Sequence, residues 1–97
     1  MTLLGLAEDG HTASLFLGSA VLAERERWVA AVDGIKAEAR ITLTYPTLES
    51  RRHIAFLVAG EKKRSILGRV LRGDDAPAAR LAAVTEPTWV VDGAARP

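Results

Sequence analysis

The sequence lacks cysteine, and this absence excludes a disulfide-stabilised scaffold, a thiolate metal site and a cysteine nucleophile. Histidine is scarce, because the chain holds only two, so a tetrahedral zinc site would need carboxylates for its remaining ligands. Aromatic residues make up 5% of the chain, and none is interleaved with the basic run Lys62-Lys63-Arg64. Stacking on the bases of a nucleic acid is therefore not indicated.

An excess of charge of either sign is also missing. The 13 lysine and arginine residues offset 12 aspartate and glutamate residues, so a net charge of +1 favours neither a nucleic acid nor an anionic membrane as partner. No apolar run approaches the roughly 20 residues that span a bilayer, and the N-terminus has no basic-then-apolar signal sequence. We therefore expect no membrane partner and a cytoplasmic location.

The residues that are present have the composition of a folded protein. Hydrophobic residues make up 48% of the 97 residues and charged residues 26%, and this length allows at most one domain. The chain opens on an apolar run over residues 2–6 without alternating polar residues, which is typical of a strand buried on both faces of a parallel sheet. Such a strand needs neighbours on both sides, so its place at residue 2 suggests that a preceding segment is absent.

Strand and helix patterns alternate along the rest of the chain. Residues 11–23 predict one helix, or two short ones around Gly18, and residues 28–32 predict a strand. The alternating residues 40–44 predict a strand with a polar threonine face, and Pro46 suits the first turn of a helix that runs to about residue 52. Further strands are predicted over residues 53–59 and 88–92, and further helices over residues 61–71 and 77–83. The alternation predicts an α/β fold with a partly parallel sheet flanked by helices.

The first candidate site is the loop that follows the first predicted strand. Glu8, Asp9 and His11 lie within four residues of one another, at the carboxyl end of a strand, where open α/β sheets bind ligands. An imidazole suits proton transfer near neutral pH, and an adjacent carboxylate can fix its tautomer and raise its basicity. The helix predicted after His11 would add free backbone N–H groups for an anion. In the alternative interpretation, Asp9 or Thr12 caps that helix, Gly10 makes the turn and His11 is merely exposed.

The second candidate site follows the strand over residues 53–59. Gly60 ends that strand, and Glu61, Lys62 and Lys63 then open a predicted helix. Cations at a helix N-terminus run against the helix dipole, so the lysines are better explained if an anion such as phosphate lies beside them. The alternative is a solvated basic surface in which Glu61 alone matches the dipole.

Arg40, His53 and the two tryptophans are the remaining residues that could carry chemistry. Arg40 leads a strand with hydroxyls on one face and could bind a carboxylate or a phosphate, although an ordinary strand-end charge is the alternative. We interpret His53 as structural, because it opens a buried strand. Trp28 and Trp89 are predicted to lie in the core.

Four ordered blocks of the sequence carry a resemblance to a known family. They are residues 4–16 (Leu-Gly-Leu-Ala-Glu-Asp-Gly-His-Thr-Ala-Ser-Leu-Phe), 40–44 (Arg-Ile-Thr-Leu-Thr), 56–63 (Phe-Leu-Val-Ala-Gly-Glu-Lys-Lys) and 89–92 (Trp-Val-Val-Asp) with Ala94 and Ala95. Together they span nearly the whole chain and closely resemble 6-phosphogluconolactonases of the pentose phosphate pathway. A more distant similarity connects the Asp-Gly-His loop to glucosamine-6-phosphate isomerases/deaminases.

The resemblance implies a Rossmann-like α/β fold and a reaction. The reaction is hydrolysis of 6-phospho-D-glucono-1,5-lactone to 6-phosphogluconate, with this sugar-phosphate lactone as small-molecule partner and without a metal or organic cofactor. Carried over by position, His11 is the general base that takes a proton from the attacking water. Asp9 would orient His11 or contact the substrate.

The resemblance also implies a set of substrate-binding residues. Lys63 aligns with a phosphate-binding lysine of the wider superfamily, and Lys62 replaces it if the register slips by one residue. Arg40 matches a family arginine that would contact the active site or an anion. Glu8 and Gly10 would complete the substrate site from the same loop as His11.

The sequence departs from the family pattern in two residues and one long segment. The family usually has glycine where Ala7 stands and proline where Leu17 stands, and neither change removes a reacting group. The N-terminal half of the family, with a Gly-rich loop and an arginine, has no counterpart here. We therefore expect residues 1–97 to be the C-terminal portion of a single domain truncated at its N-terminal side, which would associate with the missing half or with itself.

Two alternatives to an active lactonase stay open at this point. The first is a truncated, non-catalytic fragment that keeps His11 but lacks enough of the pocket to turn over substrate. The second is a relative of the glucosamine-6-phosphate isomerases/deaminases.

Overall fold

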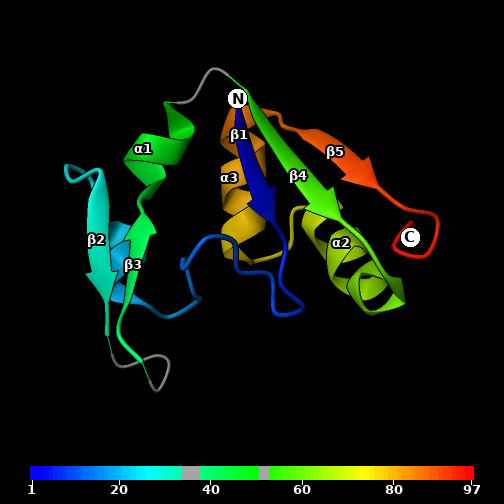
Figure 1. The fold of residues 1–97 in the computed structure, drawn as a ribbon, viewed down its shortest axis with the longest axis horizontal. Helices are drawn as coiled ribbons and strands as arrows, with labels where there is room; N and C mark the ends of the chain where they lie inside the picture. Colours follow the sequence, from blue (N-terminus) through cyan, green and yellow to red (C-terminus); the bar gives the residue numbers. More distant parts are fainter. Residues whose placement is uncertain (34–37, 51–52) are drawn as a thin grey trace.

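The chain forms two sheets in the computed structural model, which describes residues 1–33, 38–50 and 53–97 (Figure 1). The larger sheet is parallel and has the strand order β1 (Thr2–Gly5), β4 (Ile54–Val58), β5 (Thr88–Val91). The smaller sheet is an antiparallel pair formed by β2 (Val29–Val32) and β3 (Arg40–Leu43). A central β4 between β1 and β5 brings the start, middle and end of the chain together.

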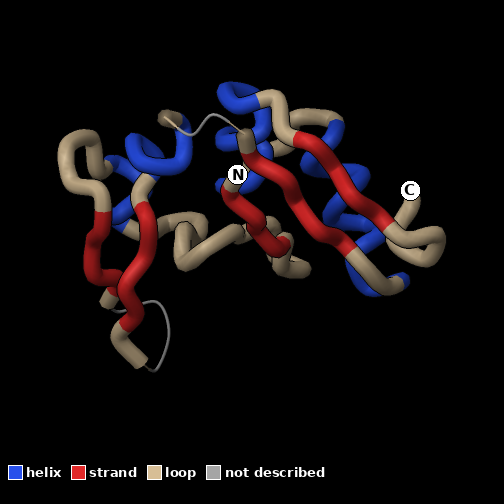
Figure 2. Tube along the Cα trace, turned by 45° about the horizontal axis from the view of Figure 1, so that its top comes forward, coloured by secondary structure: helices blue, strands red, loops and turns tan. Residues whose placement is uncertain are grey.

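Helices cover one side of the parallel sheet. These are α2 (Arg64–Leu71), which continues the short 3-10 helix η2 (Glu61–Lys63), and α3 (Pro77–Thr85) (Figures 1 and 2). A further 3-10 helix, η1 (Ala20–Ala23), and the short helix α1 (Tyr45–Glu49) accompany the β2–β3 pair. The predicted α/β class, with a parallel sheet and flanking helices, is confirmed. None of the helices in the described ranges is long and apolar enough to cross a membrane.

The core lies between the parallel sheet and these two helices. Leu4, Phe56 and Trp89 are neighbours across the three strands, and Phe56 stacks on Trp89 with ring centroids 4.5 Å apart. Leu67 of α2 and Leu81 of α3 are fully buried in the same cluster. Burying a side chain of this size stabilises the fold by about 1.5–3 kcal/mol, so this layer supplies much of the stability.

The opposite side of the parallel sheet is not covered by the described residues. Leu3 of β1 is 60% exposed. Leu57 of β4 and Val90 of β5 lie on the same face of the sheet and are exposed as well. The prediction that the first strand is buried on both faces is therefore wrong, because β1 is an edge strand with one bare face. Trp28 was predicted in the core but is 75% exposed, whereas Trp89 is partly buried and packs against the core.

The helix predicted over residues 11–23 is wrong over most of its length, because tertiary contacts hold this segment in another conformation. Residues 11–19 form turns rather than a helix, and only η1 within the predicted range 11–23 is helical. The hydroxyl of Thr12 donates to the carbonyl of Gly5 at 2.8 Å, and the backbone N–H of Ser14 donates to the hydroxyl of Thr42 at 3.0 Å. These long-range bonds, with a φ of +52° at Ala13, replace the local bonds that a helix needs.

The faces of β3 alternate as predicted, but the threonine face points inward. Thr42 is 3% exposed and Ile41 is 77% exposed. The buried hydroxyl of Thr44 donates to the carbonyl of Arg27 at 2.5 Å, and Thr47 donates to that of Trp28 at 2.8 Å. Buried hydroxyls with such partners satisfy backbone carbonyls that would otherwise be left unpaired.

The remaining elements match their predictions closely. The strands predicted over 53–59 and 88–92 are β4 and β5, and the helix predicted over 61–71 is η2 followed by α2. The helix predicted from residue 46 is α1, which ends at Glu49, and residues 51 and 52 at its predicted end lie outside the described residues. The helix predicted over 77–83 is α3, which extends to Thr85.

Candidate active site

The loop after β1 folds back on itself through short backbone hydrogen bonds. The N–H of Ala7 donates to the carbonyl of His11 at 3.0 Å, and the N–H of Gly10 donates to the carbonyl of Ala7 at 2.9 Å. The φ angle of Ala7 lies outside the left-handed region, so alanine fits where the family has glycine. The loop is therefore ordered, and it holds His11 at the carboxyl end of β1, where a ligand was expected.

Gly10 holds this loop against α3. Its φ of +89° suits glycine, and a Cβ at this position would lie 2.7 Å from the Cβ of Ala76. Its carbonyl accepts a hydrogen bond of 3.0 Å from the N–H of Ala78 in the first turn of α3, where backbone donors have no partner within the helix. Gly10 thus allows the loop to pack against α3, and its own N–H already donates to the carbonyl of Ala7.

Asp9 and His11 form a carboxylate–imidazole pair. The Nδ1 atom of His11 lies 2.5 Å from Oδ1 of Asp9, which also accepts the backbone N–H of His11 at 3.1 Å. Because an ionised carboxylate can only accept, Nδ1 carries the proton and Nε2 is the nitrogen able to accept another. The side chains of Asp9 and His11 are 59% and 23% exposed, respectively, and even with Nε2 protonated as well, an ion pair this open to water contributes at most about 1 kcal/mol. The pair therefore matters for the tautomer of His11 more than for stability.

Strand β3 contacts this loop through Phe16. The buried ring of Phe16 lies 4.3 Å from the imidazole of His11, centroid to centroid, with the planes tilted by 46°. The guanidinium carbon of Arg40 lies 5.9 Å from the centroid of the same Phe16 ring. Arg40 therefore lies on the side of Phe16, a residue of the segment that follows the His11 loop, and the role of Arg40 in the site stays a prediction.

Lys63 reaches the loop from the other side. Its ammonium group donates to the carbonyl of Leu6 at 2.5 Å, and an ammonium group has two further N–H donors.

The turn before Lys63 is held by Asp92. A φ of +97° at Gly60 turns the chain from β4 into η2, and both carboxylate oxygens of Asp92 accept the Gly60 N–H at 3.1 Å. Hydrogen bonds from the N–H groups of Ala95 and Gly60 lower the pKa of Asp92 below its ordinary value. Asp92 thus holds the turn that delivers Lys63.

A cavity of about 400 Å³ lies between these groups. His11, Thr12 and Lys63 line it, together with Gly5, Leu6, Ala7 and Ala13. Residues from two candidate sites that are far apart in the sequence therefore meet at one opening. Glu8, Lys62 and Arg40 are exposed and are not part of this lining, although Arg40 is connected to it through Phe16.

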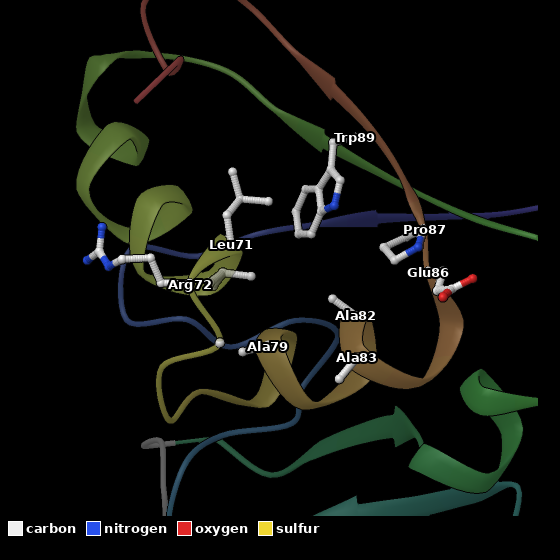
Figure 3. A pocket seen from close by; sticks show the side chains of 10 residues that line it. Leu71, Arg72, Ala79, Ala82, Ala83, Glu86, Pro87 and Trp89 are labelled. Carbon is white, nitrogen blue, oxygen red and sulfur yellow. The ribbon is translucent and has the colours of Figure 1, made fainter.

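A second cavity of about 390 Å³ lies between α2, α3 and β5 (Figure 3). Leu71 and Trp89 point toward its middle, while Arg72 and Glu86 extend away from it. Its lining within the described chain includes none of the predicted site residues. We therefore assign the candidate active site to the first cavity, which is lined by the imidazole that Asp9 bonds and by the ammonium group of Lys63.

A metal centre is not apparent in the part of the chain that the structure describes. Within residues 1–33, 38–50 and 53–97, no three histidine, aspartate or glutamate side chains gather closely enough to hold a metal ion.

Three residues that hold the site carried no predicted functional role. Phe16 contacts His11, Thr42 binds the loop at Ser14, and Asp92 fixes Gly60. All three lie in the blocks that carry the family resemblance, which was the available signal. Their roles depend on long-range contacts that no spacing within one block could reveal.

The chain is similar to proteins of one known family. A family model described as glucosamine-6-phosphate isomerases/6-phosphogluconolactonase matches residues 1–90. The chain is 39% identical over 102 residues to the 6-phosphogluconolactonase of Rattus norvegicus, a match that covers 98% of this chain and 39% of that protein. The solved structure of 6-phosphogluconolactonase from Trypanosoma cruzi has a TM-score of 0.79 at 31% identity, covering 96% of this chain and 38% of that one.

A solved monomeric glucosamine-6-phosphate deaminase is also similar. It has a TM-score of 0.73 at 20% identity, covering 96% of this chain and 45% of that one, and this likeness concerns the fold alone. The chain spans about two fifths of the length of the curated relatives described above.

Proposed function

The chain belongs to the glucosamine-6-phosphate isomerase/6-phosphogluconolactonase family, and from this premise we propose that the protein carrying it hydrolyses 6-phospho-D-glucono-1,5-lactone to 6-phosphogluconate. The observation that carries the proposal is the Asp9–His11 pair at a cavity that Lys63 also lines. An imidazole with a fixed tautomer and a nearby cation suit a phosphorylated ester that is cleaved by water.

In the proposed mechanism, His11 moves a proton twice. The oxygen of a water molecule forms a bond to the lactone carbonyl carbon while Nε2 of His11 takes a proton from that water. The bond between this carbon and the ring oxygen then breaks, and the ring oxygen receives the proton back from His11. Asp9 accepts the Nδ1–H throughout and so stabilises the imidazolium that forms between the two transfers. No electron leaves the substrate, so the reaction needs no redox cofactor.

Lys63 is the proposed contact of the substrate phosphate. One of its N–H donors is used by Leu6, and the other two are available to phosphate oxygens, to which a charged donor binds strongly. Arg40 would add a second positive charge at the edge of the site, and Lys62 is the alternative to Lys63. Glu8 and Gly10 remain proposed members of the site through the loop that they share with His11.

The test of the base is the whole protein with His11→Ala. We expect kcat for lactone hydrolysis, measured above the spontaneous rate, to fall by about 10²–10⁴-fold, because a positioned general base contributes that much. The matched control is His53→Ala, since His53 is the other histidine of this chain and bonds Thr88 on the parallel sheet. Full activity in His11→Ala would remove the assignment of the base.

The test of the phosphate contact is Lys63→Ala, with Lys62→Ala beside it. We expect KM for the phosphorylated lactone to rise by about 10- to 100-fold, because a hydrogen bond to a charged group is worth about 1.5–3 kcal/mol. Glucono-1,5-lactone, which lacks the phosphate, should be hydrolysed equally by the wild type and by Lys63→Ala. Equal losses on both substrates would contradict a phosphate role, and a larger effect in Lys62→Ala would move the role to Lys62.

An isomerase/deaminase of glucosamine 6-phosphate is the second candidate, because the family description names glucosamine-6-phosphate isomerases beside the lactonase and a deaminase shares the fold. Incubation of the whole protein with glucosamine 6-phosphate separates the two, and we expect no release of ammonia. The same lactone assay on residues 1–97 alone tests whether this portion turns over substrate without the rest of the protein.

A further inference from the structure

We propose that Phe16 is a positioning residue for His11, whose buried ring keeps the imidazole in the orientation that leaves Nε2 to the reacting water. This inference rests on the proposed function, because it gives Phe16 a part in the step for which His11 is the base. The Phe16 ring lies against the imidazole of His11, at 4.3 Å between centroids.

Asp9 by itself cannot fix the plane of the imidazole. Its carboxylate contacts the ring at one atom, Nδ1, and a ring held at one point can still tilt about that contact. Asp9 is also 59% exposed, so water competes for the same oxygen atoms. A second contact on the ring face is needed to define the orientation of Nε2, and Phe16 supplies it.

Phe16 is itself held by the fold rather than by the loop surface. It is 3% exposed and belongs to the hydrophobic core. Its carbonyl accepts the N–H of Ser19 at 3.0 Å, and two residues earlier the N–H of Ser14 is bonded to the buried hydroxyl of Thr42. The Phe16 ring is therefore held in place by the core, and the partly exposed imidazole of His11 packs against it.

The same ring is also close to Arg40. Its guanidinium carbon lies 5.9 Å from the Phe16 centroid, a distance at which a cation is attracted to an aromatic face. Removal of the ring should therefore loosen the packing of both His11 and Arg40.

The test uses the whole protein with Phe16→Leu, which keeps an apolar side chain but removes the ring, and Phe16→Tyr, which keeps the ring. For Phe16→Leu we expect kcat to fall by about 10- to 100-fold with KM changed by less than about 3-fold, since small misplacements of a reacting group have effects of this size. Phe16→Tyr should recover most of the lost kcat. Equal kcat values in Phe16→Leu and the wild type would overturn the proposal.

A second readout does not depend on activity. The imidazole C–H resonances of His11, assigned in NMR spectra by their loss in His11→Gln, carry the ring-current effect of Phe16. We expect the chemical shifts of the His11 resonances to change in Phe16→Leu and to stay nearly the same in Phe16→Tyr. The His53 resonances should keep their chemical shifts in both variants. A fall in kcat without movement of the His11 resonances would mean general damage and would also overturn the proposal. Phe16→Met replaces Phe16→Leu if the latter does not fold.

Failure of the proposed function has a different signature. If His11 is not the base, His11→Ala has the same lactonase activity as the wild type, whatever the activities of the Phe16 variants.

Discussion

Gly10 meets two demands at once, one from its backbone and one from its neighbours. Its φ of +89° is unfavourable for any residue with a Cβ, and the space that a Cβ would need is taken by Ala76 at 2.7 Å and by Ile66 at 3.3 Å. The loop that carries His11 is therefore pressed onto α3 at this point. An alanine here would have to change the backbone angle and also push the loop and α3 apart.

We predict that Gly10→Ala lowers the free energy of unfolding by about 2–5 kcal/mol, because left-handed backbone costs a residue with a Cβ about 1–2 kcal/mol and overpacking adds about 1–3 kcal/mol. Urea unfolding of the whole protein measures this loss. The control is Gly18→Ala, where φ is +85° but nothing lies within 4 Å of the added Cβ. Equal losses in the two variants would show that the contact with Ala76 is irrelevant.

The sequence predicted the chemistry of single residues better than it predicted which other residues they contact. Asp9 and His11 were expected to act together because they are two residues apart, and they form a pair at 2.5 Å. Phe16 lies in a block that resembles the family, but no role was predicted for it, because an aromatic side chain in a loop gives no sign of what its ring will touch. Its contact with Arg40 depends on the packing of β3, which no local pattern specifies.

At the scale of elements, alternation defined the two faces of β3 but not their direction. Thr42 and Thr44 share one face and Ile41 and Leu43 share the other, as predicted. The alternation did not indicate which face is buried, and the hydroxyls lie inside, where they have backbone partners on Ser14 and Arg27. The pattern of a strand records periodicity, whereas the identity of the buried face depends on what packs against it.

The same reasoning separates the correct helix from the incorrect one. The segment that became α2 buries Ile66, Leu67 and Val70 along one face, so helical periodicity and packing agree there. Residues 11–19 have helix-forming composition, but the hydroxyl of Thr12 donates to the carbonyl of Gly5 and the backbone N–H of Ser14 donates to the hydroxyl of Thr42. Tertiary bonds from distant elements override a local propensity that is worth only tenths of a kcal/mol per residue.

Asp92 connects the ends of β4 and β5, and its contribution should depend on pH. Bonds from the N–H groups of Ala95 and Gly60 lower its pKa in the folded state. A lowered pKa adds stability that is fully present above the ordinary aspartate value of about 3.9 and is lost as pH falls through the lower folded value. We predict that Asp92→Asn reduces the urea midpoint at pH 7 and that this difference shrinks below about pH 4.

The control for Asp92 is Asp75→Asn, which neutralises an exposed carboxylate on the loop before α3. Its urea midpoint should stay close to that of the wild type at pH 7. A midpoint difference for Asp92→Asn that is the same at pH 7 and at pH 3 would contradict the role of the charge. A shift of KM in Asp92→Asn is also expected, since Gly60 begins the turn that leads to Lys63.

At the scale of the whole molecule, the described chain has two uncovered apolar faces. One is the bare side of the parallel sheet with Leu3, Leu57 and Val90, and the other is the outer face of the β2–β3 pair, where Val29 and Ile41 are exposed. Large exposed apolar patches mark surfaces that contact other chains or segments. Because the curated relatives are about two and a half times as long as this chain, we propose that further segments of the protein cover these faces.

We predict that residues 1–97, produced alone, self-associate, whereas the whole protein does not do so through these faces. Light scattering after size-exclusion chromatography should give a mass above 10.4 kDa that rises with concentration. Leu57→Lys and Ile41→Lys place a charge in each face, and both should lower that mass, because a charge cannot be buried in an apolar contact without a partner. Val84→Lys, at an exposed position of α3 on the other side of the parallel sheet, is the matched control and should leave the mass unchanged. If residues 1–97 were monomeric at all concentrations, the two apolar faces would be stable in water. That result would contradict the proposal that further segments of the protein cover them.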